Sequence, residues 1–207
     1  MRTNYCISLL LSFVPVLGFS QNLVPNPSFE EYTQCPETEG EVWKATGWTT
    51  PTWSTDFFHA CSPEVWGFST PNTDFGYQIP RTGQGYGGFY VWGETGFGAD
   101  DNRELITALF IEPLKEDTFY QVKYYINLLN EKGWAISNIG AWISDTIHWM
   151  PLTSDVNYFD VPFYEASPQI VNPPDRILSD TANWMEICGI YKAKGGERYI
   201  TIGNFSR

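Results

Sequence analysis

The sequence is poor in basic residues, and this shortage excludes several classes of partner. It holds 12 lysine and arginine residues against 24 aspartate and glutamate residues, for a net charge of −12 at pH 7. Nucleic acids and anionic lipid surfaces are polyanions that attract clusters of lysine and arginine. No such cluster occurs here. We therefore expect cations or neutral molecules as ligands, and no nucleic-acid partner.

Long hydrophobic runs and helical periodicity are also scarce. Beyond residue 20, no segment approaches the roughly 20 apolar residues that cross a bilayer as a helix, so we expect no transmembrane segment in the mature chain. Short alternating runs bounded by Gly, Pro, Asn and Asp recur instead. This pattern is typical of an all-β protein.

The one long apolar stretch, in residues 1–20, has the three parts of a cleavable signal peptide. Arg2 is the basic start, residues 7–17 are the apolar centre, and Gly18-Phe19-Ser20 is the small-residue site before Gln21. A buried amino-terminal strand is the alternative. Cleavage would remove Arg2 and leave residues 21–207 as one exported domain with a net charge of −13.

Cysteine is scarce, and its positions fit an oxidising compartment. Cys6 would leave with the signal peptide. Cys35 and Cys61 each stand beside a proline-containing turn, and we expect them to form a disulfide that pins a long early loop. Cys188 lies among isoleucines and is expected to be a buried, inert thiol. No Cys-x-x-Cys or His-x-x-x-His spacing occurs, so a zinc site is not expected.

The clearest strand is predicted at residues 118–129. Tyr120, Val122, Tyr124 and Ile126 fall on one face, whereas Gln121 and Lys123 fall on the other, as in an antiparallel sheet with one packed face. The other expected strands are residues 86–92, 103–112, 137–144, 183–191 and 198–204. Gly195-Gly196 is expected to join the last two strands as a hairpin.

Two long aromatic-rich loops interrupt the strands, at residues 37–77 and 148–174. Loops of this length in a compact domain are usually functional or poorly ordered. We expect the first to be ordered, because the proposed Cys35–Cys61 disulfide closes its first half. No internal repeat or linker is evident, and a single domain is the simplest organisation.

Several short motifs, in their order along the chain, resemble galactose-binding-like jelly rolls, the β-sandwiches of many carbohydrate-binding modules. The closest resemblance is to a subset at the amino terminus of exported Gram-negative envelope proteins. It covers roughly residues 22–205, and its motifs are Leu23-Val24-Pro25-Asn26-Pro27-Ser28-Phe29-Glu30, Gly47-Trp48, Asp56-Phe57-Phe58-His59-Ala60-Cys61, Gly76-Tyr77-Gln78, Gly85-Tyr86-Gly87-Gly88, Tyr120-Gln121-Val122-Lys123-Tyr124-Tyr125 and Ile200-Thr201-Ile202-Gly203-Asn204-Phe205.

The resemblance implies an antiparallel jelly roll whose first strand lies within residues 22–31. Relatives continue past the Gly-Asn-Phe segment into a final strand, and often into a domain that anchors or sorts the protein, whereas this sequence stops at Arg207. We therefore expect either a fragment or a sandwich without its final strand. Export to the surface, the exterior or the periplasm of a Gram-negative bacterium is implied as well.

Calcium is the cofactor that the resemblance implies. Related sandwiches often hold a structural calcium with the acidic residue after the first Asn-Pro-x-Phe turn, which is Glu30 here. Calcium takes six to eight oxygen ligands. The second side-chain ligand typically comes from the final strand, so a site at Glu30 would be incomplete.

Catalytic motifs are missing. His59 and His148 both lie in loops outside any recognised catalytic pattern, and no Gly-x-Ser-x-Gly, P-loop or His-Glu-x-x-His motif occurs. A pair of carboxylates at suitable separation would serve a glycosidase. The 24 acidic residues keep that alternative open.

Sugar binding uses what the chain has in excess. Nine tryptophans and 12 tyrosines offer faces that stack on pyranose rings, while polar side chains bind the hydroxyls. Trp53, Trp66, Trp92 and Trp134 lie in loops or at strand ends and are the candidate stacking residues, with Arg103 as a candidate for the hydroxyls. Strand patterning places a second group in the core: Trp48, Tyr120, Tyr124 and Trp184.

Three functions are compatible with these features. The first is a non-catalytic exported domain that binds glycan or another envelope polymer, such as a polysaccharide or peptidoglycan, within a larger surface protein. The second is a structural or adhesion domain that packs against a neighbouring domain or protein partner. The third is a glycosidase. At least two of the four candidate tryptophans around one groove would favour the first over the second.

Overall fold

A computed structural model describes residues 21–52, 54–91, 103–131, 134–147 and 166–206. The predicted signal peptide, residues 1–20, lies outside them. The described chain holds two short 3-10 helices, η1 (Val42–Lys44) and η2 (Glu64–Trp66). Its strands are β1 (Trp48–Thr49), β2 (Asp56–His59), β3 (Asn72–Thr73), β4 (Gly76–Tyr77), β5 (Gly85–Gly88), β6 (Leu105–Leu109), β7 (Phe119–Ile126), β8 (Ile139–Ser144), β9 (Ile170–Val171), β10 (Met185–Lys192) and β11 (Tyr199–Asn204).

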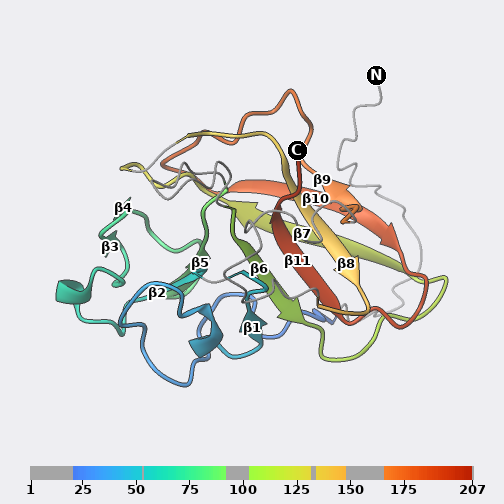
Figure 1. Ribbon diagram of the computed structural model, residues 1–207, viewed down its shortest axis with the longest axis horizontal. Helices are drawn as coiled ribbons and strands as arrows, with labels where there is room; N and C mark the ends of the chain where they lie inside the picture. Colours follow the sequence, from blue (N-terminus) through green and yellow to red (C-terminus); the bar gives the residue numbers. More distant parts are fainter. Residues whose placement is uncertain (1–20, 53, 92–102, 132–133, 148–165, 207) are drawn as a thin grey trace, which may run out of the picture.

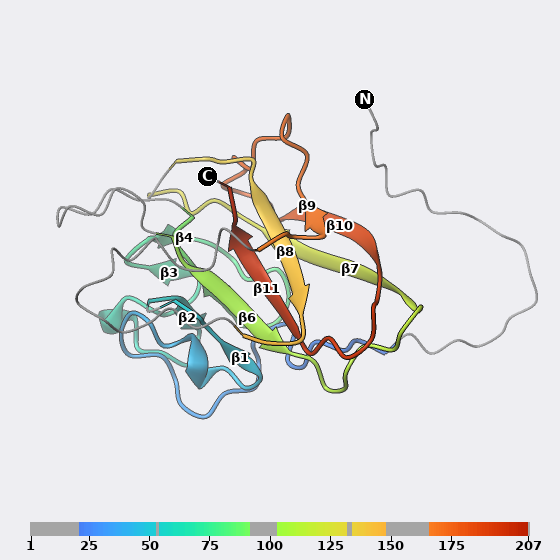
Figure 2. The ribbon, with the colours of Figure 1, turned by 45° about the vertical axis from the view of Figure 1, so that its right-hand side comes forward.

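The strands form an antiparallel β-sandwich, which confirms the expected fold class (Figure 1). The larger layer is a five-stranded sheet in the order β1-β6-β11-β8-β9. β7 and β10 pair with each other from Phe119–Lys192 to Ile126–Met185 and lie across one face of that sheet (Figure 2). Two small ladders, β2–β5 and β3–β4, complete the pairing of the described strands.

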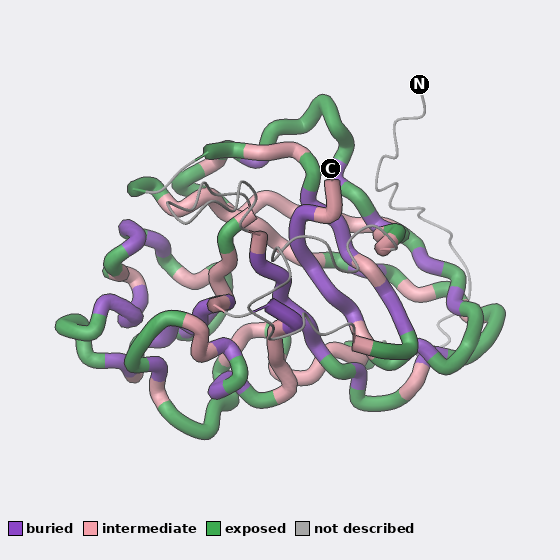
Figure 3. The backbone as a smooth tube through the Cα atoms, in the orientation of Figure 1, coloured by how far each residue is buried: buried purple, intermediate pink, exposed green. Residues whose placement is uncertain are grey.

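One hydrophobic core joins the two layers. The larger layer contributes Ile106 of β6, Ile139 of β8 and Ile202 of β11, and the smaller layer contributes Val122 of β7 and Ile187 of β10. Figure 3 shows the buried backbone running along β6, β8 and β11. Removal of these apolar side chains from water is the main favourable contribution to the packing of the layers.

β7 has the two faces that its sequence predicts. Val122 is buried, and Gln121 and Lys123 are exposed. The other inward side chains pack against the core but are only half-buried: Tyr120, Tyr124 and Ile126. They are half-buried because the groove described below opens beside them.

The six strands expected from alternation all exist, as β5, β6, β7, β8, β10 and β11, with ends shifted by up to four residues. The sequence does not predict β1 to β4 or β9. β1, β3, β4 and β9 are two residues long, too short to show a period of two, and the four residues of β2 are all buried, so they show no alternation. Residues 37–77 are therefore a loop with its own short elements.

The expected hairpin at Gly195-Gly196 is wrong. β10 pairs with β7, whereas β11 pairs with β6 and β8, so this connection crosses between the layers. Both glycines have the expected positive φ, 94° and 93°. The Glu197 carboxylate organises the crossing, because it accepts the N–H groups of Lys194 and Gly195 and the hydroxyl of Tyr191.

The expected first strand within residues 22–31 is also wrong. Asn26 and Phe29 have positive φ values of 47° and 63°, and the Phe29 N–H donates to the Asn26 carbonyl at 3.1 Å. The Asn26 side chain bridges this turn to the carbonyls of Glu31 and Thr46. A side chain that satisfies the backbone locally competes with strand pairing.

Cys35 and Cys61 form the predicted disulfide, with Cα atoms 5.7 Å apart. Cys188 differs from its expectation. It is half-buried on β10 and is not a free thiol.

Candidate functional site: a groove between the two layers

A groove of about 1140 Å³, partly open to solvent, lies where the smaller layer ends. Residues 119–129 of β7 and its extension line one side, and residues of the amino-terminal segment and β5 line another. The floor is apolar and is formed by core side chains of the larger sheet, which are themselves almost fully buried: Ile106, Ile139, Ile143, Ile200 and Ile202.

The groove follows from the unequal layers. Neighbouring strands are about 4.8 Å apart, so the two strands β7 and β10 cover only part of the five-stranded sheet. The remainder is partly covered by the irregular amino-terminal segment, which is held by the bond from the Ile111 N–H to the Leu23 carbonyl. An irregular segment fills less space than a paired strand, and the groove is the space left.

Aromatic side chains dominate the lining. Phe29 and Trp48 stack with ring centroids 4.4 Å apart, and Tyr86 and Trp184 meet edge to face at 5.7 Å. Phe58, Phe75, Phe89, Tyr90, Phe110, Phe119, Tyr120, Tyr124, Tyr125 and Trp134 complete the set. Such a surface suits apolar side chains or sugar faces.

Three polar atoms in the lining are buried without a hydrogen-bond partner: Tyr86 Oη, Tyr124 Oη and Asn127 Oδ1. Burial raises the pKa of both tyrosines, so both hydroxyls are protonated donors at neutral pH. An unpaired buried polar group costs about 1–3 kcal/mol. None of the three atoms is exposed to solvent in the free protein, so a ligand would pair with them only as neighbouring side chains move aside.

Among the described lining residues, three carry a carboxyl, guanidinium or amino group: Asp56, Arg81 and Lys123. The guanidinium carbon of Arg81 lies 3.5 Å from the centroid of the Tyr125 ring. Lys123 Nζ lies 3.3 Å from Glu186 Oε2. Burial, and to a smaller extent nearby carboxylates, raises the pKa of Asp56 to about 8, against the opposing Gly40 N–H. Asp56 is therefore mainly neutral at pH 7, and the groove carries basic charge in an acidic protein.

The predicted stacking tryptophans do not gather in this groove. Trp134 lines it and is 76% exposed. Trp66 is 41% exposed, but it lies on η2 and does not line the groove. Trp53 and Trp92 lie outside the described residues.

Arg103, the candidate for sugar hydroxyls, donates to the backbone carbonyls of Asn204 and Ser206 at the end of β11. It does not line the groove. Its role in ligand binding stays a prediction, and the contacts described here are structural.

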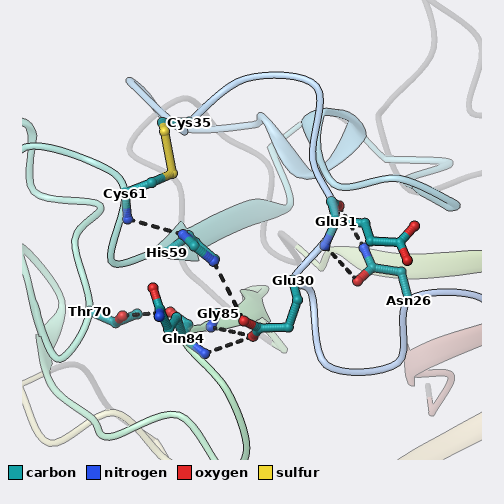
Figure 4. Close-up of polar contacts among 9 residues, drawn as sticks. All are labelled: Asn26, Glu30, Glu31, Cys35, His59, Cys61, Thr70, Gln84 and Gly85. Carbon is teal, nitrogen blue, oxygen red and sulfur yellow. Dashed lines mark hydrogen bonds and ion pairs between the residues drawn. A yellow bond between two sulfur atoms is a disulfide. The ribbon is translucent and has the colours of Figure 1, made fainter.

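Glu30 holds the turn that precedes β5 (Figure 4). Its Oε1 accepts the N–H groups of Gln84 and Gly85 at 2.7 and 3.2 Å. Its Oε2 lies 4.0 Å from His59 Nε2. The contacts of this carboxylate are therefore with N–H donors, whereas calcium needs oxygen ligands. Calcium at Glu30 stays a prediction from the resemblance.

His59 has a defined tautomer. It is 3% exposed on β2, and its Nδ1 accepts the Cys61 N–H at 3.0 Å, so the proton of the neutral ring is on Nε2. Nε2 is buried without a hydrogen-bond partner. Burial lowers the pKa of His59, and Glu30 partly offsets this effect. The His59 ring packs against the rings of Tyr32 and Phe57, with centroids 4.7 and 5.8 Å apart.

Two buried carboxyl groups, Asp56 and Glu104, influence each other electrostatically. Asp56 accepts the Gly40 N–H at 2.8 Å. Glu104 accepts the Tyr90 N–H at 2.8 Å and the Ser54 hydroxyl, and burial raises its pKa. Both groups accept hydrogen bonds from backbone N–H groups, and of the two only Asp56 lines the groove.

No family model, curated protein or solved structure matches this chain. The resemblance to galactose-binding-like domains therefore stays a prediction. Across the described residues, no three His, Cys, Asp or Glu side chains group so as to hold a metal ion. The same residues contain no helix long and apolar enough to cross a membrane.

Sequence reasoning missed the polar residues of the groove. It placed Tyr124 in the core by its position in the alternation, and it did not single out Tyr86 or Asn127. The available signal was the pair of tyrosines among the inward positions of β7, because a tyrosine on a packed face needs a partner for its hydroxyl.

Proposed function

We propose that this protein is a non-catalytic exported domain that docks a segment of a partner protein in the groove between its two layers. The single observation that carries the proposal is the groove itself. It has an apolar floor, two unpaired phenolic hydroxyls and an unpaired amide oxygen. A polypeptide brings apolar side chains together with backbone donors and acceptors, which are the two kinds of group that such a lining accommodates.

Export is supported by the predicted signal peptide and by the Cys35–Cys61 disulfide. The lack of a catalytic role is supported by the contacts of His59, Asp56 and Glu104, which are with protein backbone and neighbouring side chains. We assign the protein to the surface, the exterior or the periplasm of a Gram-negative bacterium on the resemblance alone.

Glycan binding is the second candidate, and exposed Trp134 at the groove favours it. An indole face beside unpaired hydroxyls would suit a sugar chain such as a polysaccharide or peptidoglycan. The protein-docking proposal is preferred because only this one of the described candidate tryptophans reaches the groove.

The test is a binding screen of the purified protein against extended peptides and against natural polysaccharides, including peptidoglycan, followed by tryptophan fluorescence. Trp134→Ala should weaken binding of any groove ligand about tenfold or more. Trp43→Ala is the matched control, since Trp43 is 56% exposed on η1 and lies outside the groove.

Peptide binding that depends on Trp134 supports protein docking, whereas polysaccharide binding with the same dependence supports the second candidate. Binding that is equally affected by both variants, or absent for every probe, would overturn the groove as the functional site.

A further inference from the structure

β7 has a free edge in the described structure. It pairs with β10 over its whole length, and no other described strand pairs with it. In an antiparallel pair, every second residue directs its N–H and C=O groups away from the partner strand. On β7, these groups point to the side opposite β10.

This free edge borders the groove. Successive side chains of a strand point to opposite faces. A cavity that lay against one face of β7 would therefore contact only every second residue. All eight residues of β7 line the groove, including the outward-facing Gln121 and Lys123. The edge of the strand, with its unpaired backbone groups, therefore faces the cavity.

The floor beside this edge is suited to a strand. Ile106, Ile200 and Ile202 belong to central strands of the larger sheet and line the groove. A strand beside β7 would direct every second side chain onto this floor, because packed sheets are about 10 Å apart. The polar positions between them would face solvent.

The unpaired polar atoms select a ligand with backbone-like groups. Tyr124 lies on β7 and Tyr86 on β5, and both offer a hydroxyl donor, while Asn127 Oδ1 offers an acceptor. A pure hydrocarbon would leave all three unsatisfied. A strand pairs with the regular donors and acceptors of β7, whereas a glycan presents its hydroxyls without that repeat.

The charge beside β7 favours an acidic segment. Arg81 presents its guanidinium over the Tyr125 ring, next to Lys123 on the same outer face of β7. Glu186 partly neutralises both, because it forms an ion pair with Lys123 and also interacts electrostatically with Arg81, so two cations face one carboxylate. A carboxylate on the incoming strand would pair with Arg81 in a planar geometry that guanidinium favours.

We propose that β7 accepts an extended segment of a partner protein as an added strand, with apolar residues at every second position on the groove floor and an acidic residue near Arg81. This inference rests on the proposed protein-docking function and specifies how the partner is held. It makes β7–β10 a three-stranded layer when the partner is bound.

The probes are ten-residue peptides with valine or isoleucine at every second position, threonine or serine between them, and one terminal aspartate. Matched peptides carry either N-methyl groups on alternate backbone nitrogens or lysine in place of aspartate. Binding to the purified protein is measured by calorimetry, and hydrogen exchange is measured on residues 119–126. We expect slower amide exchange in β7 on binding, about tenfold or weaker affinity after N-methylation, and a several-fold loss with lysine.

Two tyrosine variants separate binding from folding. Tyr124→Phe removes an unpaired buried hydroxyl, so the melting temperature of the free protein should stay the same or rise while peptide affinity falls about five- to tenfold. Tyr191→Phe is the control, because its hydroxyl donates to Glu197 at 2.5 Å outside the groove. It should lower the melting temperature and leave the affinity unchanged.

The outcomes distinguish this inference from the proposed function. Peptides that bind in a Trp134-dependent manner without β7 protection, or that tolerate N-methylation, overturn strand addition and leave protein docking standing. Trp134-dependent polysaccharide binding without peptide binding overturns both and selects the glycan candidate. Protection in the free protein of the alternate β7 amides that point away from β10, or concentration-dependent dimers that peptides dissociate, would assign the edge to the chain itself or to a second copy and overturn the partner.

Discussion

His59 Nε2 lies 4.0 Å from Glu30 Oε2, too far for a hydrogen bond, while His59 Nδ1 accepts the Cys61 N–H at 3.0 Å. The neutral imidazole is thus fixed between the disulfide loop and the amino-terminal turn (Figure 4). Protonation would place a second N–H on Nδ1 and remove the acceptor used by Cys61.

The first prediction concerns acid stability. Burial lowers the pKa of His59 below its usual value of 6.5, so the unfolded state binds the proton more readily than the folded state. The stability contributed by neutral His59 is therefore present above pH 6.5 and is lost as the pH falls through the lowered pKa. Urea unfolding of wild type and His59→Gln between pH 7.5 and 4.5 should show a smaller acid loss in the variant. A parallel decline in both proteins would contradict this role.

Asp56 should have the opposite pH dependence. Burial, with the nearby charges, raises the pKa of Asp56 to about 8 from 3.8, so the folded state retains a proton that the unfolded state releases. Its contribution is fully present below pH 3.8 and is lost as the pH rises through about 8. Asp56→Asn keeps an acceptor for the Gly40 N–H and should be more stable than wild type at pH 8, by on the order of a few kcal/mol.

The measurement for Asp56 is the difference in unfolding free energy between the variant and wild type at each pH. This difference should grow from pH 4 to pH 8 and then level off. A constant difference would mean that the Asp56 carboxyl group does not titrate in this range.

The third prediction concerns the disulfide. Cys35 and Cys61 are separated by 26 positions in sequence, and loop entropy alone gives about 3.5 kcal/mol of stabilisation for a loop of that length. The double variant Cys35→Ser, Cys61→Ser should lose stability of this order in denaturant unfolding under non-reducing conditions. Either single variant should lose at least as much, so a stable single variant would argue against the bond as a constraint.

The fourth prediction compares two isoleucines on β10. Ile187 is 2% exposed in the core, whereas Ile190 is 64% exposed on the outer face. Ile187→Ala should cost about 2–5 kcal/mol of unfolding free energy. Ile190→Ala, the matched control with the same atoms removed, should cost about 1 kcal/mol or less. Similar losses for the two variants would place both faces of β10 in a packed environment.

The sequence by itself determined the all-β class, the strands β5, β6, β7, β8, β10 and β11, the inward face of β7 and the Cys35–Cys61 bond. The strands follow from a local pattern, because apolar and polar residues alternate with a period of two when one face of a strand is packed and the other is in solvent. It also predicted positive φ at Gly195 and Gly196, since glycine enters that region at no steric cost.

The tertiary structure decided which strands became neighbours. The alternation of apolar and polar residues in β10 and β11 is the same whether these strands pair as a hairpin or lie in different layers. The Glu197 carboxylate, which accepts hydrogen bonds from Lys194, Gly195 and Tyr191, holds the connection that crosses between the layers. The resemblance implied a first strand in the amino-terminal segment, yet the hydrogen bonds of the Asn26 side chain hold this segment in a turn. The groove exists because two strands cover a sheet of five, and that count depends on pairing over long sequence distances, which no local pattern records.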